Sequence, residues 1–475
     1  MSDSLIQAPD RVLSTLNQDG SRRWLRPRPS RGTFWKWRRP VSYLLIVLFT
    51  ALPWININGK PAVFLDILHR EFTFFGLTLL PTDTLLLAFM LIGVFLTVFL
   101  VTAMFGRVWC GWMCPQTVYL EFVYRPLERL FEGDPSRRKV LAHAGWRKVA
   151  RFAVYLAVSA FLAHTFLSYF VGVSNLRAWI FGSPFQHPVA FMVMAGTTLL
   201  MLFDFGYFRE QVCVVVCPYA RLQSALLDRD SLIISYDRKR GEPRGRRRAP
   251  RKGADVALPV LAEEPGDCVD CHKCVTTCPT GIDIRDGLQL ECIGCAQCID
   301  ACNDVMGKIG REPGLIRYTS QRAVETGTTR LLRARVLIYP VLLLLVFGAF
   351  GVALVGKEAA DVQVLRAPGL PFNTMASGEI SNQLRIRITN RTDADEVYSV
   401  SVVGAERVHA VSDELSKLVP AGEQRSASVV VAAPADVFVA GKLDVTIRVE
   451  GAAGFVHDTT YRLLGPATRK EDSDG

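Results

Sequence analysis

Residues 268–302 read CVDCHKCVTTCPTGIDIRDGLQLECIGCAQCIDAC and hold eight of the 12 cysteines of this 475-residue chain. The eight cysteines form two runs of the same C-x2-C-x2-C-x3-C spacing: Cys268, Cys271, Cys274 and Cys278, followed by Cys292, Cys295, Cys298 and Cys302. This spacing is typical of a two-cluster ferredoxin, in which the fourth cysteine of each run ligates the other cluster. The stretch therefore predicts a ferredoxin module with two [4Fe–4S] clusters.

The crossover rule assigns the ligands to two mixed sets. We expect one cluster to be held by Cys268, Cys271, Cys274 and Cys302, and the other by Cys278, Cys292, Cys295 and Cys298. Pro279 follows the first run, as is usual for this motif, whereas Asn303 follows the second. That departure removes no ligand.

Three other interpretations of these cysteines are disfavoured. Structural zinc sites use two pairs of ligands rather than a repeated run of four. Disulfides are rare in the reducing cytosol, where we place this segment below. The five residues from Cys268 to His272 match the C-x-x-C-H signature of haem attachment, but their cysteines are already needed by the ferredoxin pattern.

The other four cysteines form two C-x-x-x-C-P motifs, one with Cys110 and Cys114 and one with Cys213 and Cys217. Residues four apart share one face of a helix, so each pair can direct two sulfurs at one point. Four such thiols can hold Cu(I), zinc or an additional iron–sulfur centre, or can exchange disulfides. The alternative is that they are small apolar residues packed at helix ends, which is less expected for two identical motifs.

Five stretches are long and apolar enough to cross a bilayer: residues 41–57, 84–105, 152–173, 188–208 and 336–355. A helix of about 20 residues spans the roughly 30 Å hydrocarbon core. The first stretch is the shortest and contains Pro53. This composition excludes a purely soluble enzyme.

The basic residues between these spans alternate in number. Lys plus Arg amount to 9 in residues 1–40, 2 in 58–83, 8 in 106–148, 1 in 174–187 and 20 in 209–334. Cytosolic loops are enriched in Lys and Arg. We therefore expect a cytosolic amino terminus and a cytosolic ferredoxin segment, with everything after the fifth span outside. The first 40 residues contain no apolar core of a removable signal peptide.

The segment after the fifth span alternates apolar and polar residues, as in Leu384, Ile386 and Ile388. This period of two is typical of antiparallel strands, and a β-sandwich of immunoglobulin-like type is expected. The predicted domains are a basic tail at 1–40, four membrane helices at 41–208 with the two C-x-x-x-C-P motifs at cytosolic helix ends, and a cytosolic domain at 209–335 with the ferredoxin module at about 260–310. A fifth membrane helix at 336–355 and an external sandwich at 357–475 follow.

The motifs described above leave several charged residues unexplained. Residues 238–252 are strongly basic, and we expect them to contact anionic lipid head groups rather than nucleic acid, for which the chain has no fold signature. His164 and Asp204 lie within predicted spans. Ionisable groups inside a membrane are candidates for proton, quinone or metal contacts, and hydrogen bonding between helices is the alternative. For Asp204, helix termination near Gly206 with pairing to Arg209 is a further alternative.

Six segments of the chain resemble the FixG/CcoG/RdxA family, the accessory proteins of cbb3-type cytochrome oxidase. They include WININGKP at 54–61, GRVWCGWMCPQTVYLE at 106–121, CPYARLQSALLD at 217–228, RGEPRG at 240–245 and GLIRY at 314–318, together with the ferredoxin run. With the terminal sandwich, the resemblance covers most of the chain after residue 40.

The resemblance implies a protein of the bacterial inner membrane that assists oxidase maturation. In that role it would act as an oxidoreductase that reduces Cu(II) to Cu(I) for the binuclear copper centre, with copper on Cys110, Cys114, Cys213 and Cys217. The implied partners are membrane lipid, oxidase assembly and copper-transport proteins and a cytosolic electron donor, and a homodimer is left open. Rival interpretations are a quinone-linked relay similar to NapH-type ferredoxins and a scaffold without enzymatic activity.

The predicted topology can be tested with tags or cysteine-accessibility probes at one position on each side of the fifth span. A probe at Gly253 should react only after the cells are permeabilised, because positive charge retains that segment in the cytosol. A probe at Gly454 should react in intact spheroplasts. A cytosolic Gly454 would remove one span from the predicted count.

Overall fold

The structure, a computed structural model, describes residues 11–466 apart from 18, 58–59, 68–69, 81–82, 134–144, 246–265, 329–332, 393, 404–406, 413–414 and 453. Gly253 and the second half of the basic stretch 238–252 lie outside these residues. The chain divides into two compact units. One contains residues 1–77 and 88–349, and the other contains residues 78–87 and 350–475.

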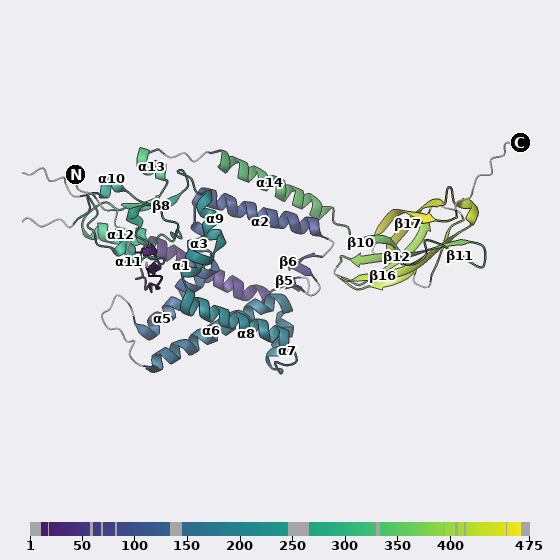
Figure 1. Ribbon diagram of the computed structural model, residues 1–475, viewed down its shortest axis with the longest axis horizontal. Coiled ribbons are helices and arrows are strands. Elements are labelled where there is room, and N and C mark those ends of the chain that lie inside the picture. The colour runs from purple at the N-terminus through teal and green to yellow at the C-terminus, as the bar shows by residue number, and fades with distance from the viewer. Residues whose placement is uncertain are drawn as a thin grey trace, which may run out of the picture. The chain divides into compact units, whose positions relative to one another are not determined.

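Among the described residues, four helices are long and apolar enough to cross a membrane (Figure 1). They are α2 Thr84–Phe105, α6 Gly145–Val171, α8 Pro188–Phe203 with its π-helical extension Asp204–Phe208, and α14 Ala334–Val355. They confirm four of the five predicted spans as helices of this kind, and they make the chain a membrane protein. The predicted span at 41–57 is not among these four helices. Its residues lie in the second part of α1 Thr33–Ala51, in the short 3-10 helix Leu52–Trp54 and in the short strand β3 Asn56–Ile57.

Glycine and proline set the ends of several of these helices. Gly106 and Gly172 follow α2 and α6 with φ of 61° and 77°, a left-handed conformation that stops a helix at little cost for glycine. Pro188 begins α8 at a position where its missing N–H costs nothing. Within the bundle, α6 packs against α8, and α14 runs beside α2 with the Phe347 ring against Gly93 (Figure 1).

The ferredoxin segment lies in the same unit as these helices. Its short helices are α11 Lys273–Thr276 and α12 Gln297–Lys308. They pack beside an antiparallel pair of strands, β8 Ile233–Tyr236 and β9 Ile316–Thr319. This segment is therefore framed by strands from both before and after the cysteine runs.

The remaining elements of this unit are short. They are the strands β1 Arg11–Leu13, β2 Leu16–Asn17, β3 Asn56–Ile57, β4 Lys60–Pro61, β5 Val63–Asp66, β6 Glu71–Phe74 and β7 Leu77–Leu79, and the helices α3 Val108–Trp112, α4 Pro115–Tyr119, α5 Arg125–Glu132, α7 Val173–Ile180, α9 Pro218–Leu226, α10 Arg238–Gly241 and α13 Gln321–Thr326.

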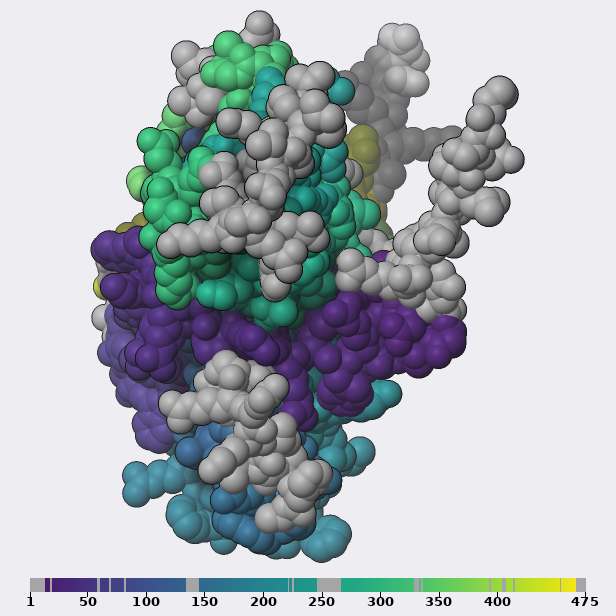
Figure 2. Space-filling view, turned by 90° about the vertical axis from the view of Figure 1, so that its left-hand side faces the viewer, coloured from purple at the N-terminus to yellow at the C-terminus, as the bar shows by residue number. Residues whose placement is uncertain are grey.

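The amino-terminal residues bind the ferredoxin segment directly. The Arg28 N–H donates to the Thr276 carbonyl at 2.9 Å, and the Thr277 hydroxyl donates to the Arg28 carbonyl at 2.7 Å. Leu25 is buried against Gly281. Figure 2 shows these purple residues crossing the face between the green ferredoxin segment and the blue helices. The predicted basic tail is thus part of the folded unit over its described residues.

The carboxyl-terminal unit is a sandwich of two antiparallel sheets. One sheet has the order β10 Ala360–Arg366, β12 Ile380–Asn390, β16 Gln424–Ala433 and β14 His409–Val411, with β11 Asn373–Thr374 beside β12. The other has the order β15 Ser416–Val419, β13 Glu396–Val403, β17 Lys442–Gly451 and β18 Val456–Leu464. The predicted sandwich is confirmed.

The predicted alternation places the apolar residues of both sheets in one core. Leu384 pairs with Val429 in one sheet, and Val400 pairs with Val449 in the other. These four side chains belong to one cluster of buried residues with Ile386, Ile388 and Ile447. Strand alternation puts every second side chain on the same face, so burial of this face explains the register.

Replacing Ile447 by Ala should destabilise the sandwich by about 2–5 kcal/mol, because it leaves a cavity in a close-packed core. The Ile447 side chain is fully buried. Hydrogen exchange of the β17 amides in the full-length protein measures the change in opening free energy. Val439, which is 78% exposed, is the matched control. Val439→Ala should change the opening free energy by less than about 0.5 kcal/mol. Equal effects of both changes would contradict this core.

Candidate functional site

The two cysteine runs adopt the same backbone conformation. Asp270 and His272 have φ of 51° and 53°, and their counterparts in the second run, Gly294 and Ala296, have φ of 68° and 61°. Positive φ is uncommon for residues other than glycine. Its recurrence at equivalent positions shows that both loops coil in the same way between their cysteines.

A helix continues each coiled loop and carries further thiols. Cys274 lies on α11, and Cys298 and Cys302 lie on α12. Because Cys298 and Cys302 are four residues apart, they project from one face of α12. That face is directed at both loops, since Cys302 lies in one buried cluster with Cys268 and Cys274 of the first run, and Cys292 of the second run packs against this cluster.

The thiols fall into two neighbouring groups by their mutual electrostatic effects. Cys302 interacts with Cys268 and Cys271, and Cys274 interacts with Cys302 and Cys271. Cys278 instead lines a cavity with Cys292, Cys295 and Cys298. Cys298 interacts with Cys274 as well as with Cys278, Cys292 and Cys295, so the crossover assignment of Cys274 and Cys278 stays a prediction. Cys274 also borders this cavity, so the two sets adjoin there.

The cavity of the second set fits an iron–sulfur cluster. Apart from its cysteines and Thr280, it is lined by Ile234, Ile282, Ile284 and Ile293. Burial raises the pKa of the Cys295 thiol to about 12 and that of Cys292 to about 11. Thiols in such surroundings ionise only when a cation compensates their charge, and cluster iron supplies that charge.

No group of three or more His, Cys, Asp or Glu side chains in the described part of the chain is close enough to bind one metal ion together.

The two C-x-x-x-C-P motifs also share one local geometry. Cys114 and Cys217 have extended backbones, with φ and ψ of −59° and 125° and of −65° and 111°. The residue before proline is restricted to such conformations. Pro115 and Pro218 then begin α4 and α9, so each motif turns the chain between two helical segments.

The structure brings the four thiols of these motifs together. Cys213 interacts electrostatically with Cys114, Cys110 and Cys217. The Cys110 thiol donates a hydrogen bond to the Gln223 side-chain oxygen at 3.1 Å. Burial raises the pKa of Cys110 to about 12 and raises the pKa of Cys114 and Cys213. We name Cys110, Cys114, Cys213 and Cys217 the paired thiols.

The paired thiols lie against the loop of the second cysteine run. Cys110 and Cys295 belong to one small buried cluster, with Cys213 packed against it. At Gly111, a Cβ would stand 2.6 Å from the Ile293 carbonyl oxygen and 2.8 Å from the Cys295 nitrogen. Only glycine allows so close an approach. The sequence analysis did not predict this contact.

Buried charges hold the two parts of the site together. The Arg107 guanidinium donates to the carbonyl oxygens of Leu290 and Ala220, and to that of Cys292 at 3.2 Å. One side chain thus joins the turn before Cys110 to the ferredoxin loop and to α9.

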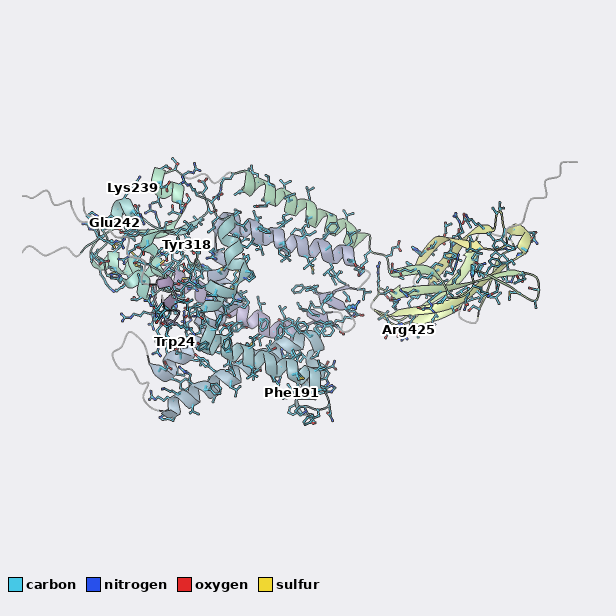
Figure 3. The ribbon with its side chains drawn as sticks, in the orientation of Figure 1. Trp24, Phe191, Lys239, Glu242, Tyr318 and Arg425 are labelled. Atoms are coloured by element: carbon cyan, nitrogen blue, oxygen red, sulfur yellow. The ribbon has the colours of Figure 1, made fainter. Side chains whose placement is uncertain are left out.

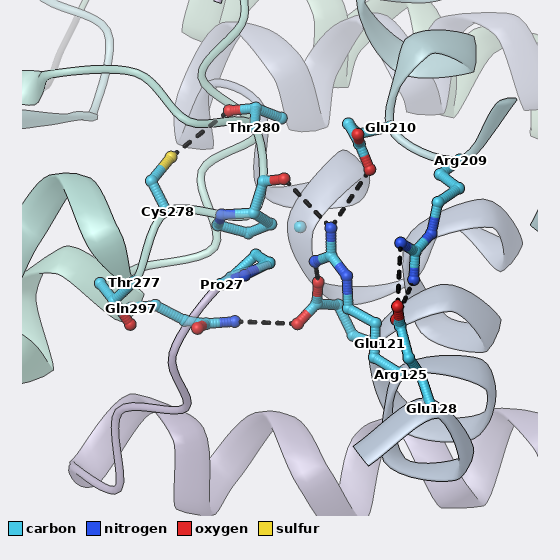
Figure 4. A network of polar contacts seen from close by, with 12 residues as sticks. Pro27, Glu121, Arg125, Glu128, Arg209, Glu210, Thr277, Cys278, Thr280 and Gln297 are labelled. Carbon is cyan, nitrogen blue, oxygen red and sulfur yellow. Dashed lines mark hydrogen bonds and ion pairs between the residues drawn. The ribbon is translucent and has the colours of Figure 1, made fainter. Parts of the chain in front are cut away.

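A second buried arginine, Arg125, contacts the chain just after the first cysteine run. Arg125 pairs with Glu121 and with Glu210, the latter at 3.3 Å, and donates to the Pro279 carbonyl at 3.3 Å. Figure 4 shows its guanidinium between these two carboxylates. Arg209 pairs with Glu128 in the same network. Each buried charge has an opposite charge in contact, which a buried ion requires.

The sequence analysis missed these arginines and Gln223. The sequence does carry a signal for buried arginines here, because Arg107 and Arg125 flank the Cys110 motif within a segment that is otherwise rich in apolar residues. A charged side chain in such a segment is rarely buried without a partner. The partner itself cannot be found from spacing alone, since it comes from a distant part of the chain.

Asp204 lies near the paired thiols, since it interacts electrostatically with Cys213. It accepts a hydrogen bond from the Gln116 amide at 2.9 Å, which is the interhelical alternative. The Arg209 side chain, its other expected partner, pairs with Glu128 instead. The Nδ1 atom of His164 donates to the Ala160 carbonyl of its own helix at 2.7 Å. The His164 ring also borders an apolar cavity of about 530 Å³ with Trp54 and Arg177.

Three family models match the chain. Residues 208–321 match a 4Fe-4S dicluster domain, and residues 87–133 match a 4Fe-4S binding domain. Residues 350–466 match the IG-like fold at the C-terminus of FixG. These matches support iron–sulfur clusters in the segment of the two cysteine runs and an immunoglobulin-like fold in the terminal sandwich.

Curated relatives match over most of the chain. The protein RdxA of Cereibacter sphaeroides is 33% identical over 399 residues, which cover 80% of this chain and 82% of RdxA. The nitrogen fixation protein FixG of Rhizobium meliloti is 32% identical over 426 residues, covering 81% of this chain and 80% of FixG. RdxB of Cereibacter sphaeroides is 33% identical, covering 84% and 85%. With its membrane helices, ferredoxin segment and terminal sandwich, the chain belongs to the FixG/RdxA family of membrane-bound iron–sulfur electron-transfer proteins.

Proposed function

We propose that the protein takes electrons from a cytosolic reductant and reduces Cu(II) to Cu(I) for the binuclear copper centre of a cbb3-type oxidase. The observation that carries this proposal is the contact between the paired thiols and the Cys295 loop. Soft thiols that can bind copper thereby lie directly against a ligand set for a redox cofactor.

The exposed Cys271 offers an entry point for electrons. Of the eight cysteines of the two runs it alone is exposed, whereas Cys268, Cys274 and Cys302 of the same set are buried. The two sets adjoin at Cys274, and the second set adjoins the paired thiols. A soluble donor would therefore deliver electrons at the first set, and they would leave from the second set toward the thiols.

The paired thiols would favour the product of the reaction. Each Cu(II) accepts one electron and becomes Cu(I), which thiolates bind in preference to Cu(II). Two [4Fe–4S] clusters, when bound, supply one-electron chemistry at low potential.

The proposed placement is the inner membrane of a bacterium, with the amino terminus and ferredoxin segment in the cytosol and the sandwich in the periplasm. The distribution of Lys and Arg supports this orientation. The likeness to FixG supports partners among oxidase assembly and copper-transport proteins. In this arrangement the paired thiols lie at the cytosolic ends of α2 and α8.

A third iron–sulfur cluster is the alternative occupant of the paired thiols. The match of residues 87–133 to a 4Fe-4S binding domain favours it, because that segment contains Cys110 and Cys114. The iron content separates the two occupants. Two clusters correspond to about eight iron atoms per chain, and three correspond to about twelve.

A quinone-linked relay is the second candidate function. The apolar cavity beside His164 favours it, since its volume of about 530 Å³ is in the range of ligand sites. The test is electron exchange between the reduced protein and a quinone analogue. The relay would be favoured over copper reduction if His164→Ala abolished this exchange while loss of the paired thiols left it unchanged.

The ligand assignment predicts asymmetric effects of two neighbouring substitutions. Cys274→Ser should remove the cluster that Cys302 completes, whereas Cys278→Ser should remove the other, because serine is a poor ligand for cluster iron. Iron and sulfide counts should fall from about eight to about four in each variant. Electron paramagnetic resonance identifies which cluster is lost. Loss of the same cluster in both variants would refute the crossover.

Replacing both members of either thiol pair by Ser or Ala should weaken Cu(I) binding by more than about tenfold and slow Cu(II) reduction, because soft ligands are lost. Iron content should stay near that of the wild type, since the eight proposed cluster ligands lie between Cys268 and Cys302. Anaerobic copper titration and initial rates measure both effects.

The Ala variants also control for packing. If the paired thiols only fill space at helix ends, Ala should cost about 1 kcal/mol of stability and leave copper handling normal. A variant with all four thiols changed to Ala that keeps its iron and reduces Cu(II) at the wild-type rate would end the copper proposal.

A further inference from the structure

Arg38 is the largest fully buried side chain among the described residues. It lies in the first turns of α1, where Lys36, Trp37 and Arg39 are all exposed. Only Arg38 and Ser42 of this helix are buried, and they are four residues apart. The helix therefore turns one arginine into the protein and leaves its neighbours at the surface.

The Arg38 guanidinium lacks the partners that a buried charge requires. Its Nε donates to the Gly111 carbonyl at 3.0 Å, and its carbon lies 5.5 Å from the centre of the Phe122 ring. Both Nη atoms are buried, and neither has a hydrogen-bond partner among the described residues. A buried charge without compensation costs several kcal/mol, so a missing anion is indicated.

The neighbouring acidic groups are already engaged or belong to the cluster site. The Asp300 carboxylate accepts the N–H groups of Phe34 and Trp35 at 3.1 and 2.8 Å. The Tyr318 hydroxyl, labelled in Figure 3, donates to the Gly294 carbonyl at 2.6 Å. Gly111, whose carbonyl Arg38 binds, lies against the backbone of Cys295. The guanidinium is therefore close to the second cysteine set, and Cys295 is the first of the groups that oppose the lowering of the Arg38 pKa by burial.

We propose that Arg38 is the counter-ion of the iron–sulfur cluster held by Cys278, Cys292, Cys295 and Cys298, and that its charge raises the reduction potential of that cluster. The inference rests on the proposed ligand set. A cluster with four thiolates is anionic and gains a further negative charge on reduction. A fixed positive charge in a buried site stabilises the reduced form more than the oxidised form.

The position of Arg38 also relates this cluster to the paired thiols. Its Nε donates to the carbonyl of Gly111, which lies between Cys110 and Cys114. Its two Nη atoms have no hydrogen-bond partner among the described residues and are available to the proposed cluster. The charge therefore favours the arrival of an electron at the set that adjoins the paired thiols. Arg38 is a positioning residue for electron flow and contacts no substrate.

Redox titration of the full-length protein, followed by electron paramagnetic resonance, tests the proposal without copper. Arg38→Met and Arg38→Gln should shift the midpoint potential of the second cluster to more negative values and leave the first cluster unchanged. Arg38→Lys keeps the charge and should restore most of the wild-type potential. Arg39→Gln is the matched control at an exposed neighbour, and should leave both potentials unchanged.

Iron and sulfide are counted in every variant first. If the neutral variants lose about four of about eight iron atoms while Arg38→Lys keeps them, the cluster requires the positive charge and the proposal is supported. Fully loaded Arg38→Met with an unshifted potential would overturn it. Loss of iron in Arg38→Lys as well would also overturn it, in favour of a structural role for the bond to Gly111. Copper reduction enters none of these measurements, so their outcome is independent of the proposed activity.

Discussion

The close contact between Gly111 of α3 and the loop at Ile293–Cys295 is the constraint on which the rest of the site depends. A Cβ at Gly111 would overlap the backbone of that loop, so the two chain segments meet without a side chain between them. The contact joins a short helix that follows the membrane helix α2 to a loop of the ferredoxin segment. It places Cys110 next to Cys295, although the two are 185 residues apart in the chain.

Buried arginines organise the surroundings of this contact. Arg107 binds the carbonyl groups on both sides of it, and Arg125 binds the loop at Pro279 together with two carboxylates. Arg38 differs from both, because its Nη atoms have no hydrogen-bond partner among the residues that the structure describes. The first two arginines therefore fix the position of the ferredoxin loops, whereas the third supplies charge to the space that the loops enclose.

The helical segments restrict the backbone around the paired thiols and so fix where these thiols lie. Each C-x-x-x-C-P motif breaks its helix before a proline, so the thiols stand at a turn whose backbone is restricted. The π-helical turns Asp204–Phe208 and Val212–Val216 precede Cys217 and shift its side chain relative to a regular helix. The sandwich forms a separate unit with its own core and contains no cysteine.

Spacing and periodicity alone determined the cysteine runs, four of the membrane helices and the sandwich, because each is a local property that a short stretch carries by itself. The repeated run of Cys268 to Cys302 also predicts the crossed ligand sets, and that assignment stays a prediction. Only the tertiary structure decided that the paired thiols meet the Cys295 loop and that Arg38 is buried while Arg39 is exposed. These outcomes depend on which distant segments pack together, and two adjacent arginines in one helix carry no sequence signal that distinguishes them.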